Sequence, residues 1–126
     1  MLEIKNLTVK VKNDAPILTD VSLSIDKGTC IGLTGASGSG KTTLIKSIMG
    51  MNGGDLEVPQ GQILLDGDDL LKRSAKERRG LCGKTIGFIP QNPMTAFFPH
   101  AKMDRQIIET LRMHTGTDKK QARELA

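Results

Sequence analysis

The chain has 126 residues, a formal net charge of +4 and 37% hydrophobic residues, values ordinary for one soluble globular domain. Tryptophan and tyrosine are absent and the first phenylalanine is Phe88, so stacking on nucleic-acid bases is poorly supported and no nucleic-acid partner is expected. No stretch approaches the ~18 apolar residues that cross a bilayer, and Met1–Lys12 does not read as a signal peptide.

The first predicted elements are two strands. Leu2–Val11 alternates apolar and polar residues, with Leu7, Val9 and Val11 on one face, which is typical of a half-buried strand. Ile17–Asp26 alternates in the same way after a short polar turn. The two segments therefore predict an antiparallel pair.

The next segments alternate between strand and helix. Thr29–Gly35 is small and apolar without alternation, which predicts a strand covered on both faces. Lys41–Gly50 has helical spacing and ends at a glycine. Met51–Gly61 is predicted to be a loop, and Gly61–Leu70 a strand with a turn at Asp66-Gly67.

From Lys72 onward the chain is predicted to form a loop, a strand and two helices. Lys72–Gly80 is interpreted as a solvated polar loop, and Lys84–Gln91 as a strand halted by Pro90. Lys102–His114 carries an apolar helical stripe. Asp118 and Gln121 then predict the capping box of a final helix. Because the sequence stops inside that helix, 126 residues are not expected to be a natural domain.

The segment between the third predicted strand and the first predicted helix contains the residues that suit ligand binding. Gly35-x-x-x-x-Gly40-Lys41-Thr42, placed between a strand and a helix, is the phosphate-loop pattern in its required context. Glycines let backbone N–H groups converge on an anion, and the helix directs its positive end to the same place. Lys41 adds a charge for phosphates, and Thr42 offers a hydroxyl to Mg²⁺.

This loop is therefore predicted to hold a nucleoside triphosphate with Mg²⁺, and the alternative is a Gly/Ser-rich turn with no ligand. The candidate binding residues are Gly35, Ala36, Ser37, Gly38, Ser39, Gly40, Lys41, Thr42 and Thr43.

The whole chain resembles the N-terminal half of an ABC-transporter ATP-binding subunit. The matching pieces are Leu18–Gly28, Gly35–Gly50, Gly61–Leu70 and Gly83–Met94. The resemblance implies an α/β fold: a P-loop NTPase (ABC ATPase) core with an antiparallel β subdomain, truncated before the Walker B strand. Residues 1–126 would form the N-terminal part of one nucleotide-binding domain.

The resemblance also implies roles for single residues. Gln91 matches the glutamine that reaches the Mg²⁺ and the attacking water and couples the site to the membrane partner, so Gln91 is a candidate catalytic and metal-contacting residue. Family members often stack adenine on an aromatic residue before the loop. Here Val11 or Lys12 stands at that place, which implies loose selection of the base.

Pro90–Pro99 resembles the dipeptide, oligopeptide and nickel importer branch, with Phe98 where an asparagine is usual. The resemblance then implies an ATP-binding subunit that powers uptake of peptides or nickel-type substrates. Its partners would be transmembrane permease subunits and a second ATP-binding subunit. It would lie in the cytoplasm, peripheral on the inner face of the cell membrane.

ATP hydrolysis needs groups that this chain does not offer. No Asp-Glu strand and no Ser-Gly-Gly signature occurs, and Ile63–Gly67 precedes Gln91 and places a glycine after Asp66. We therefore expect the 126-residue chain alone to bind ATP without turnover. Two alternatives stay open: a truncated nucleotide-binding module without turnover, and a non-transport ABC ATPase.

Overall fold

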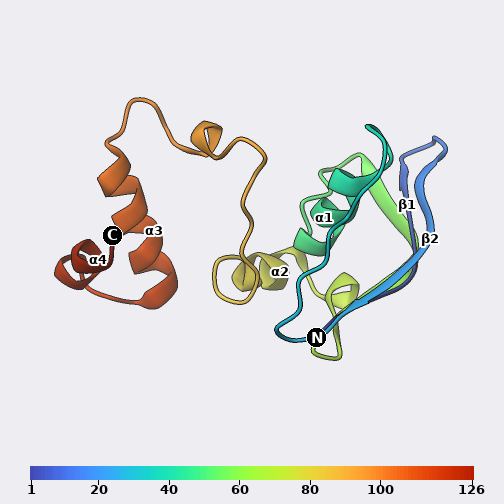
Figure 1. The fold of residues 1–126 in the computed structure, drawn as a ribbon, viewed down its shortest axis with the longest axis horizontal. Helices are drawn as coiled ribbons and strands as arrows, with labels where there is room; N and C mark the ends of the chain where they lie inside the picture. The colour runs from blue at the N-terminus through green and yellow to red at the C-terminus, as the bar shows by residue number, and fades with distance from the viewer. The chain divides into compact units, whose positions relative to one another are not determined.

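The computed structural model describes residues 1–126, which form two compact units, Met1–Gly80 and Leu81–Ala126. The first unit contains a four-stranded sheet and helix α1 (Lys41–Met49), and helix α2 (Ala75–Leu81) ends at its boundary (Figure 1). The second unit contains helices α3 (Met103–Thr115) and α4 (Lys119–Leu125).

The sheet has the order β2-β1-β3-β4, and each neighbouring pair is antiparallel. Its strands are β1 (Leu2–Val11), β2 (Pro16–Ile25), β3 (Leu56–Leu65) and β4 (Asp68–Asp69). The predicted antiparallel pairing of the first two strands is confirmed.

Strand β3 begins at Leu56, five residues before the predicted start at Gly61, within a stretch interpreted as a loop. Leu56 pairs with Val11 and Glu57 pairs with Lys10, where an ion pair of 3.4 Å also joins the two side chains. Pairing along the full length of β1 thus extends β3 into residues with weak strand signals.

Each of the three long strands departs from regular strand geometry near the middle of the sheet. Asn6 in β1 and Asp20 in β2 have positive φ angles of 48° and 53°, and the register shifts beside them. The Asn6 side-chain amide donates to Asp20 Oδ1 at 2.8 Å, and the Asp20 backbone N–H donates to Thr8 Oγ1 at 3.2 Å. These bonds offset the cost of left-handed backbone at two non-glycine residues.

The bulge at Asn6 changes which side chains of β1 face the core. Ile4 and Leu7 are three residues apart, yet both are buried, because the extra residue resets the alternation between them. Val9 is buried and Val11 half-buried, as the alternation predicts. Sequence alternation therefore identifies the second half of β1 correctly and misses Ile4.

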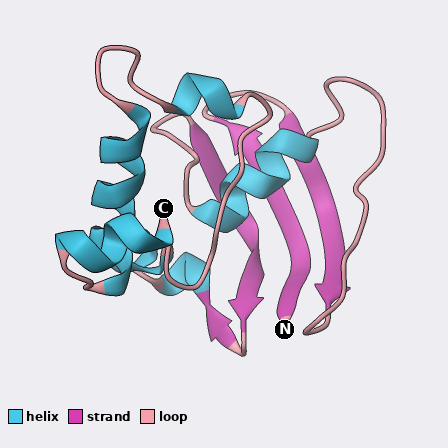
Figure 2. Cartoon of the chain, turned by 60° about the vertical axis from the view of Figure 1, so that its left-hand side comes forward, coloured by secondary structure: helices cyan, strands magenta, loops and turns pink.

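Helix α1 lies across one face of the sheet (Figure 2). It buries Leu44, Ser47 and Met49, and the sheet contributes Ile4, Leu7, Val9, Leu18 and Ile63 to the buried side chains of the same unit. The helix ends where predicted, at Gly50, whose N–H donates back into the last turn.

The interpretation of Lys72–Gly80 as a loop is wrong, because Ala75–Leu81 forms helix α2. The Ser74 hydroxyl and backbone N–H both donate to the Glu77 carboxylate, and the Glu77 N–H donates to Ser74 Oγ at 3.3 Å. These hydrogen bonds from Ser74 lower the pKa of Glu77. This capping box starts the helix within a highly charged sequence.

The predicted strands Thr29–Gly35 and Lys84–Gln91 are also wrong. The first has no regular structure, and the second has a single parallel bridge between Cys82 and Ile86. A buried strand requires neighbours on both edges and cover on both faces. Ile31 remains 47% exposed and Leu33 44% exposed, so this segment has neither.

The second unit follows its local sequence signals closely. Helix α3 ends at Gly116, and α4 begins with the predicted capping box of Asp118 and Gln121. Ile108 of α3 and Ala122 of α4 are its buried apolar residues. The predicted helices are confirmed.

A substitution at Gly61 in β3 tests the account of the bulges in the middle of the sheet. A Cβ atom added there would lie 2.5 Å from Leu7 Cα, and φ is +110°. We expect Gly61→Ala to lower the free energy of unfolding by more than about 2 kcal/mol, measured by urea denaturation. The control is Gly54→Ala, where an added Cβ meets nothing within 4 Å. Equal effects of the two substitutions would contradict this account of the bulge.

Candidate functional site

The predicted binding residues Gly35–Thr43 form one continuous loop that leads into the first turn of α1. Residues 35–39 and Thr42 are exposed, Lys41 and Thr43 are half-buried, and Gly40 is buried. The structure therefore brings all nine residues together, with most of the loop open to a ligand.

The loop carries backbone N–H groups that no protein acceptor uses. Ser39 N–H donates to Ala36 O at 3.3 Å, and Leu44 N–H makes the first helical bond, to Gly40 O at 2.9 Å. The amides of Gly38 and Gly40–Thr42 donate to no protein group. A helix start leaves such donors unpaired and carries the positive end of the helix dipole, so this place suits an anion.

Lys41 closes the loop on itself. Its Nζ donates to Gly35 O at 2.8 Å, to Ala36 O at 2.7 Å and to Ser39 Oγ at 3.2 Å. All three donors of the ammonium group thus lie on the loop, which places one positive charge at its centre. A phosphate in the loop would compete with the two carbonyl oxygens for this group.

Gly40 fixes the loop to the sheet. A Cβ atom at Gly40 would lie 2.5 Å from Leu18 Cδ2 and 3.3 Å from Ile17 O, and φ is +86°. A side chain there would therefore have to displace the Leu18 side chain or the start of α1, and it would also be strained by the positive φ. The second glycine of the motif is needed for packing as well as for approach to an anion.

Thr42 stands on the exposed side of the first helical turn, and its hydroxyl has no partner in the protein. By contrast, Thr43 is half-buried, and its carbonyl accepts from Ser47 Oγ at 2.9 Å. Mg²⁺ takes few protein ligands and completes its shell with water and phosphate oxygens. The Thr42 hydroxyl fits that requirement.

A cavity of about 260 Å³ opens beside the loop, between β2 and α1. Leu18, Val21, Leu33 and Leu44 form much of its wall, with Lys41 and Thr34 among the polar lining residues. Phosphate requires donors, so these apolar walls do not form the anion site. Gly35, Ser39, Gly40 and Lys41 of the loop line the same cavity, so its polar side belongs to the candidate site.

Gln91 lies in the second unit, and the loop Gly35–Thr43 lies in the first. It is exposed and lies in irregular backbone just before the 3₁₀ turn Pro93–Ala96. The turn is closed by Thr95, whose hydroxyl donates to Asn92 O at 2.7 Å. The role of Gln91 stays a prediction.

Gln106 was not singled out from the sequence, yet it holds this segment on α3. Its side-chain oxygen accepts from Phe98 N–H at 2.8 Å, and its amide donates to Phe98 O at 3.1 Å and Ala101 O at 2.9 Å. A glutamine in a helix gives no sequence signal for such contacts. Gln106 acts as a positioning residue for the segment after Gln91.

Comparison with solved structures defines the class of the fold. The dimeric bacterial ABC transporter cassette MJ0796 matches 98% of this chain with a TM-score of 0.81 at 21% identity, and the chain covers 53% of it. The same cassette in a post-hydrolysis state bound to ADP and Pi matches equally well. The fold is that of an ABC ATPase cassette.

The sequence comparisons identify the family. A model described as "ABC transporter" matches residues 18–126, so the chain belongs to the ABC transporter family. It is 37% identical over 117 residues to the metal-staphylopine import system ATP-binding protein CntD of Staphylococcus aureus. It is 36% identical over 117 residues to the dipeptide transport ATP-binding protein DppD of Lactococcus lactis.

These matches cover 92% and 90% of this chain but only 43% and 34% of the two relatives. The chain thus spans less than half the length of the curated relatives it matches. None of its helices has both the length and the apolar character needed to cross a bilayer.

Proposed function

We propose that residues 1–126 are the N-terminal part of one nucleotide-binding domain, which binds Mg-ATP to power uptake of peptides or nickel-type substrates. The observation that carries this proposal is the exposed loop Gly35–Thr43, with unused amides and the Lys41 ammonium group at a helix start. Relatives named for dipeptide and metal-staphylopine import support the substrate class.

In this proposal each part of the loop has one task. The amides of residues 35–43 surround the phosphates, and Lys41 moves from the carbonyls of Gly35 and Ala36 to the β- and γ-phosphates. The Thr42 hydroxyl would hold Mg²⁺, which would supply positive charge to neutralise the phosphates. Gln91 would hold the metal and the attacking water in the complete subunit.

The same proposal includes the protein partners and the location of the chain in the cell. Transmembrane permease subunits and a second ATP-binding subunit complete the transporter, and the chain lies on the cytoplasmic face of the membrane. The relatives' names, and a dimeric cassette of the same fold, support this assembly. A nucleotide-binding module without turnover and a non-transport ABC ATPase are the alternatives, and the import names of the relatives favour neither.

The first experiment titrates the purified chain with fluorescent ATP and Mg²⁺ while phosphate release is followed. We expect saturable binding without release, because the sequence offers no Asp-Glu strand and no signature segment. Lys41→Ala should weaken binding at least about tenfold, since a charged contact to phosphate is lost. Lys46→Ala, on the same helix, is the control. Unchanged affinity in Lys41→Ala would overturn the phosphate-loop assignment.

Thr42→Ala tests the metal contact separately. The affinity for ATP in the presence of chelator should stay at the value of the unmodified chain, because the amides and Lys41 remain. The gain in affinity on adding Mg²⁺ should shrink, since one oxygen ligand is gone. Thr43→Ala serves as the control, because Thr43 is half-buried and its side chain makes no hydrogen bond within the protein. Equal metal dependence in both variants would contradict the role of Thr42.

Base selection is the third test. Lys12 is exposed after β1 and offers no aromatic ring, so we expect ATP and GTP to compete with dissociation constants within about threefold. Lys12→Tyr should tighten both, because stacking on an aromatic ring is worth about 1–3 kcal/mol per base. Tripolyphosphate, which has no base, should bind both proteins equally. A strong preference of the unmodified chain for ATP would argue against this view.

A further inference from the structure

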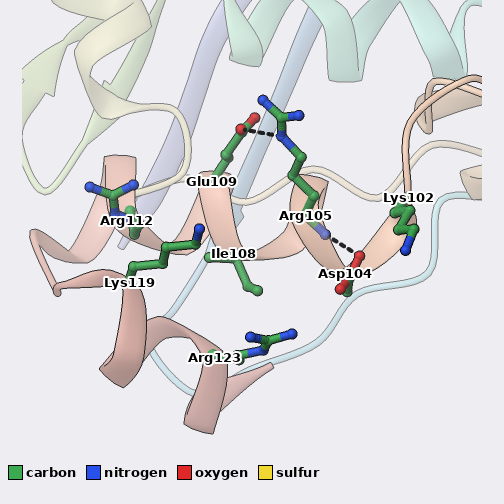
Figure 3. A pocket seen from close by; sticks show the side chains of 8 residues that line it. All are labelled: Lys102, Asp104, Arg105, Ile108, Glu109, Arg112, Lys119 and Arg123. Carbon is green, nitrogen blue, oxygen red and sulfur yellow. Dashed lines mark hydrogen bonds and ion pairs between the residues drawn. The ribbon is translucent and has the colours of Figure 1, made fainter.

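Helices α3 and α4 of the second unit line a cavity of about 330 Å³ that contains none of the residues proposed to bind nucleotide. Figure 3 shows charged side chains from both helices arranged around Ile108, whose exposed fraction is 7%. The cationic lining residues are Lys102, Arg105, Arg112, Lys119 and Arg123. The cavity therefore has a buried apolar floor and positively charged walls.

Two carboxylates also line the cavity, and both have partners close by. Arg105 Nε donates to Glu109 Oε1 at 3.0 Å, and the Arg105 backbone N–H donates to Asp104 Oδ1 at 2.7 Å (Figure 3). The Arg105–Glu109 pair is thus neutral as a unit. Asp104 keeps its negative charge, so the five cations and two carboxylates give the lining a net charge of +3.

Four of the cationic side chains have no ion-pair partner in the structure: Lys102, Arg112, Lys119 and Arg123. Helix energetics do not explain this arrangement. Lys119 and Arg123 are four residues apart on α4, where like charges destabilise a helix by about 0.2–0.5 kcal/mol. An anion bound between Lys119 and Arg123 would attract both side chains and so offset their mutual repulsion.

The size and chemistry of the cavity restrict the ligand. About 330 Å³ is near the lower end of small-molecule pockets, so the ligand is small. Arg112 and Arg123 offer planar guanidinium groups that bind phosphate oxygens in pairs, and Lys119 adds a compact charge. No aromatic side chain lines the cavity, so a nucleotide base would have no stacking surface.

We propose that the α3–α4 cavity is a second anion site, which binds a small free phosphoanion carrying at least two phosphoryl groups, of the pyrophosphate class. The site is separate in its residues from the glycine loop, and the proposal does not depend on the proposed transport function. Each phosphoryl group would neutralise at least one of the four unpaired cations.

The test is a calorimetric titration with pyrophosphate in about 0.15 M salt, using the 126-residue chain with Lys41→Ala, which weakens any binding at the loop. We expect one saturable site. Lys119→Gln and Arg123→Gln should each raise its dissociation constant at least about fivefold. Lys120→Gln, one residue along the same helix but outside the cavity lining, should change it less than about twofold.

Amide chemical shifts supply a second readout, and on pyrophosphate addition they should move within residues 102–123. Circular dichroism checks that α4 persists in each variant. If a Gln variant loses helix, Arg123→Lys keeps the charge and removes the paired donors, and it should still weaken binding. No saturable binding in the parent, or equal effects of Lys119→Gln and Lys120→Gln, would overturn the proposal.

A membrane could supply the same chemistry through lipid phosphates. Sedimentation with phosphatidylglycerol–phosphatidylcholine vesicles, without pyrophosphate, separates the two sources. We expect Lys119→Gln and Lys120→Gln to sediment alike, because an anionic lipid surface attracts the two exposed lysines of α4 equally. Vesicle binding that depends on Lys119 and Arg123, without pyrophosphate binding, would overturn the assignment to a free anion.

Discussion

The contact between Gly40 and Leu18 is the constraint on which the candidate site depends. Gly40 is the buried residue of the loop, and an added Cβ would lie 2.5 Å from the Leu18 side chain of β2. This contact sets where α1 begins, and therefore where the unpaired amides of its first turn point. The sheet supplies the other half of the contact, because residues 17–18 belong to a strand whose course is set by the bulges at Asn6 and Asp20.

Elements with local signals could be predicted from the sequence. Helices α1 and α3 end at Gly50 and Gly116, and α4 begins at a capping box, because each signal lies within a few residues of the boundary it sets. The same reasoning applies to the loop, whose nine residues are contiguous. Residues 35–43 are therefore found together as the sequence predicts, although what they bind remains a proposal.

Features that depend on distant partners could not be predicted. The apolar segment Thr29–Gly35 has strand composition, but strand structure requires neighbouring strands, which composition does not report. The burial of Ile4 follows from the bulge at Asn6. This bulge is stabilised by a hydrogen bond from Asn6 to Asp20, fourteen residues further along the chain. Likewise, the contacts of Gln106 with Phe98, and the joint lining of one cavity by α3 and α4, arise only when the chain is folded.

The three hydrogen bonds of Lys41 have a thermodynamic consequence for ligand entry. The ammonium group is already ordered by Gly35, Ala36 and Ser39, so little side-chain entropy is lost when a phosphate arrives. The enthalpy gained is correspondingly reduced, because bonds to carbonyl oxygens are exchanged for bonds to phosphate oxygens. The two carbonyl oxygens and Ser39 Oγ thus take the place that phosphate oxygens would have as acceptors for Lys41, and they hold the loop in one shape without a ligand.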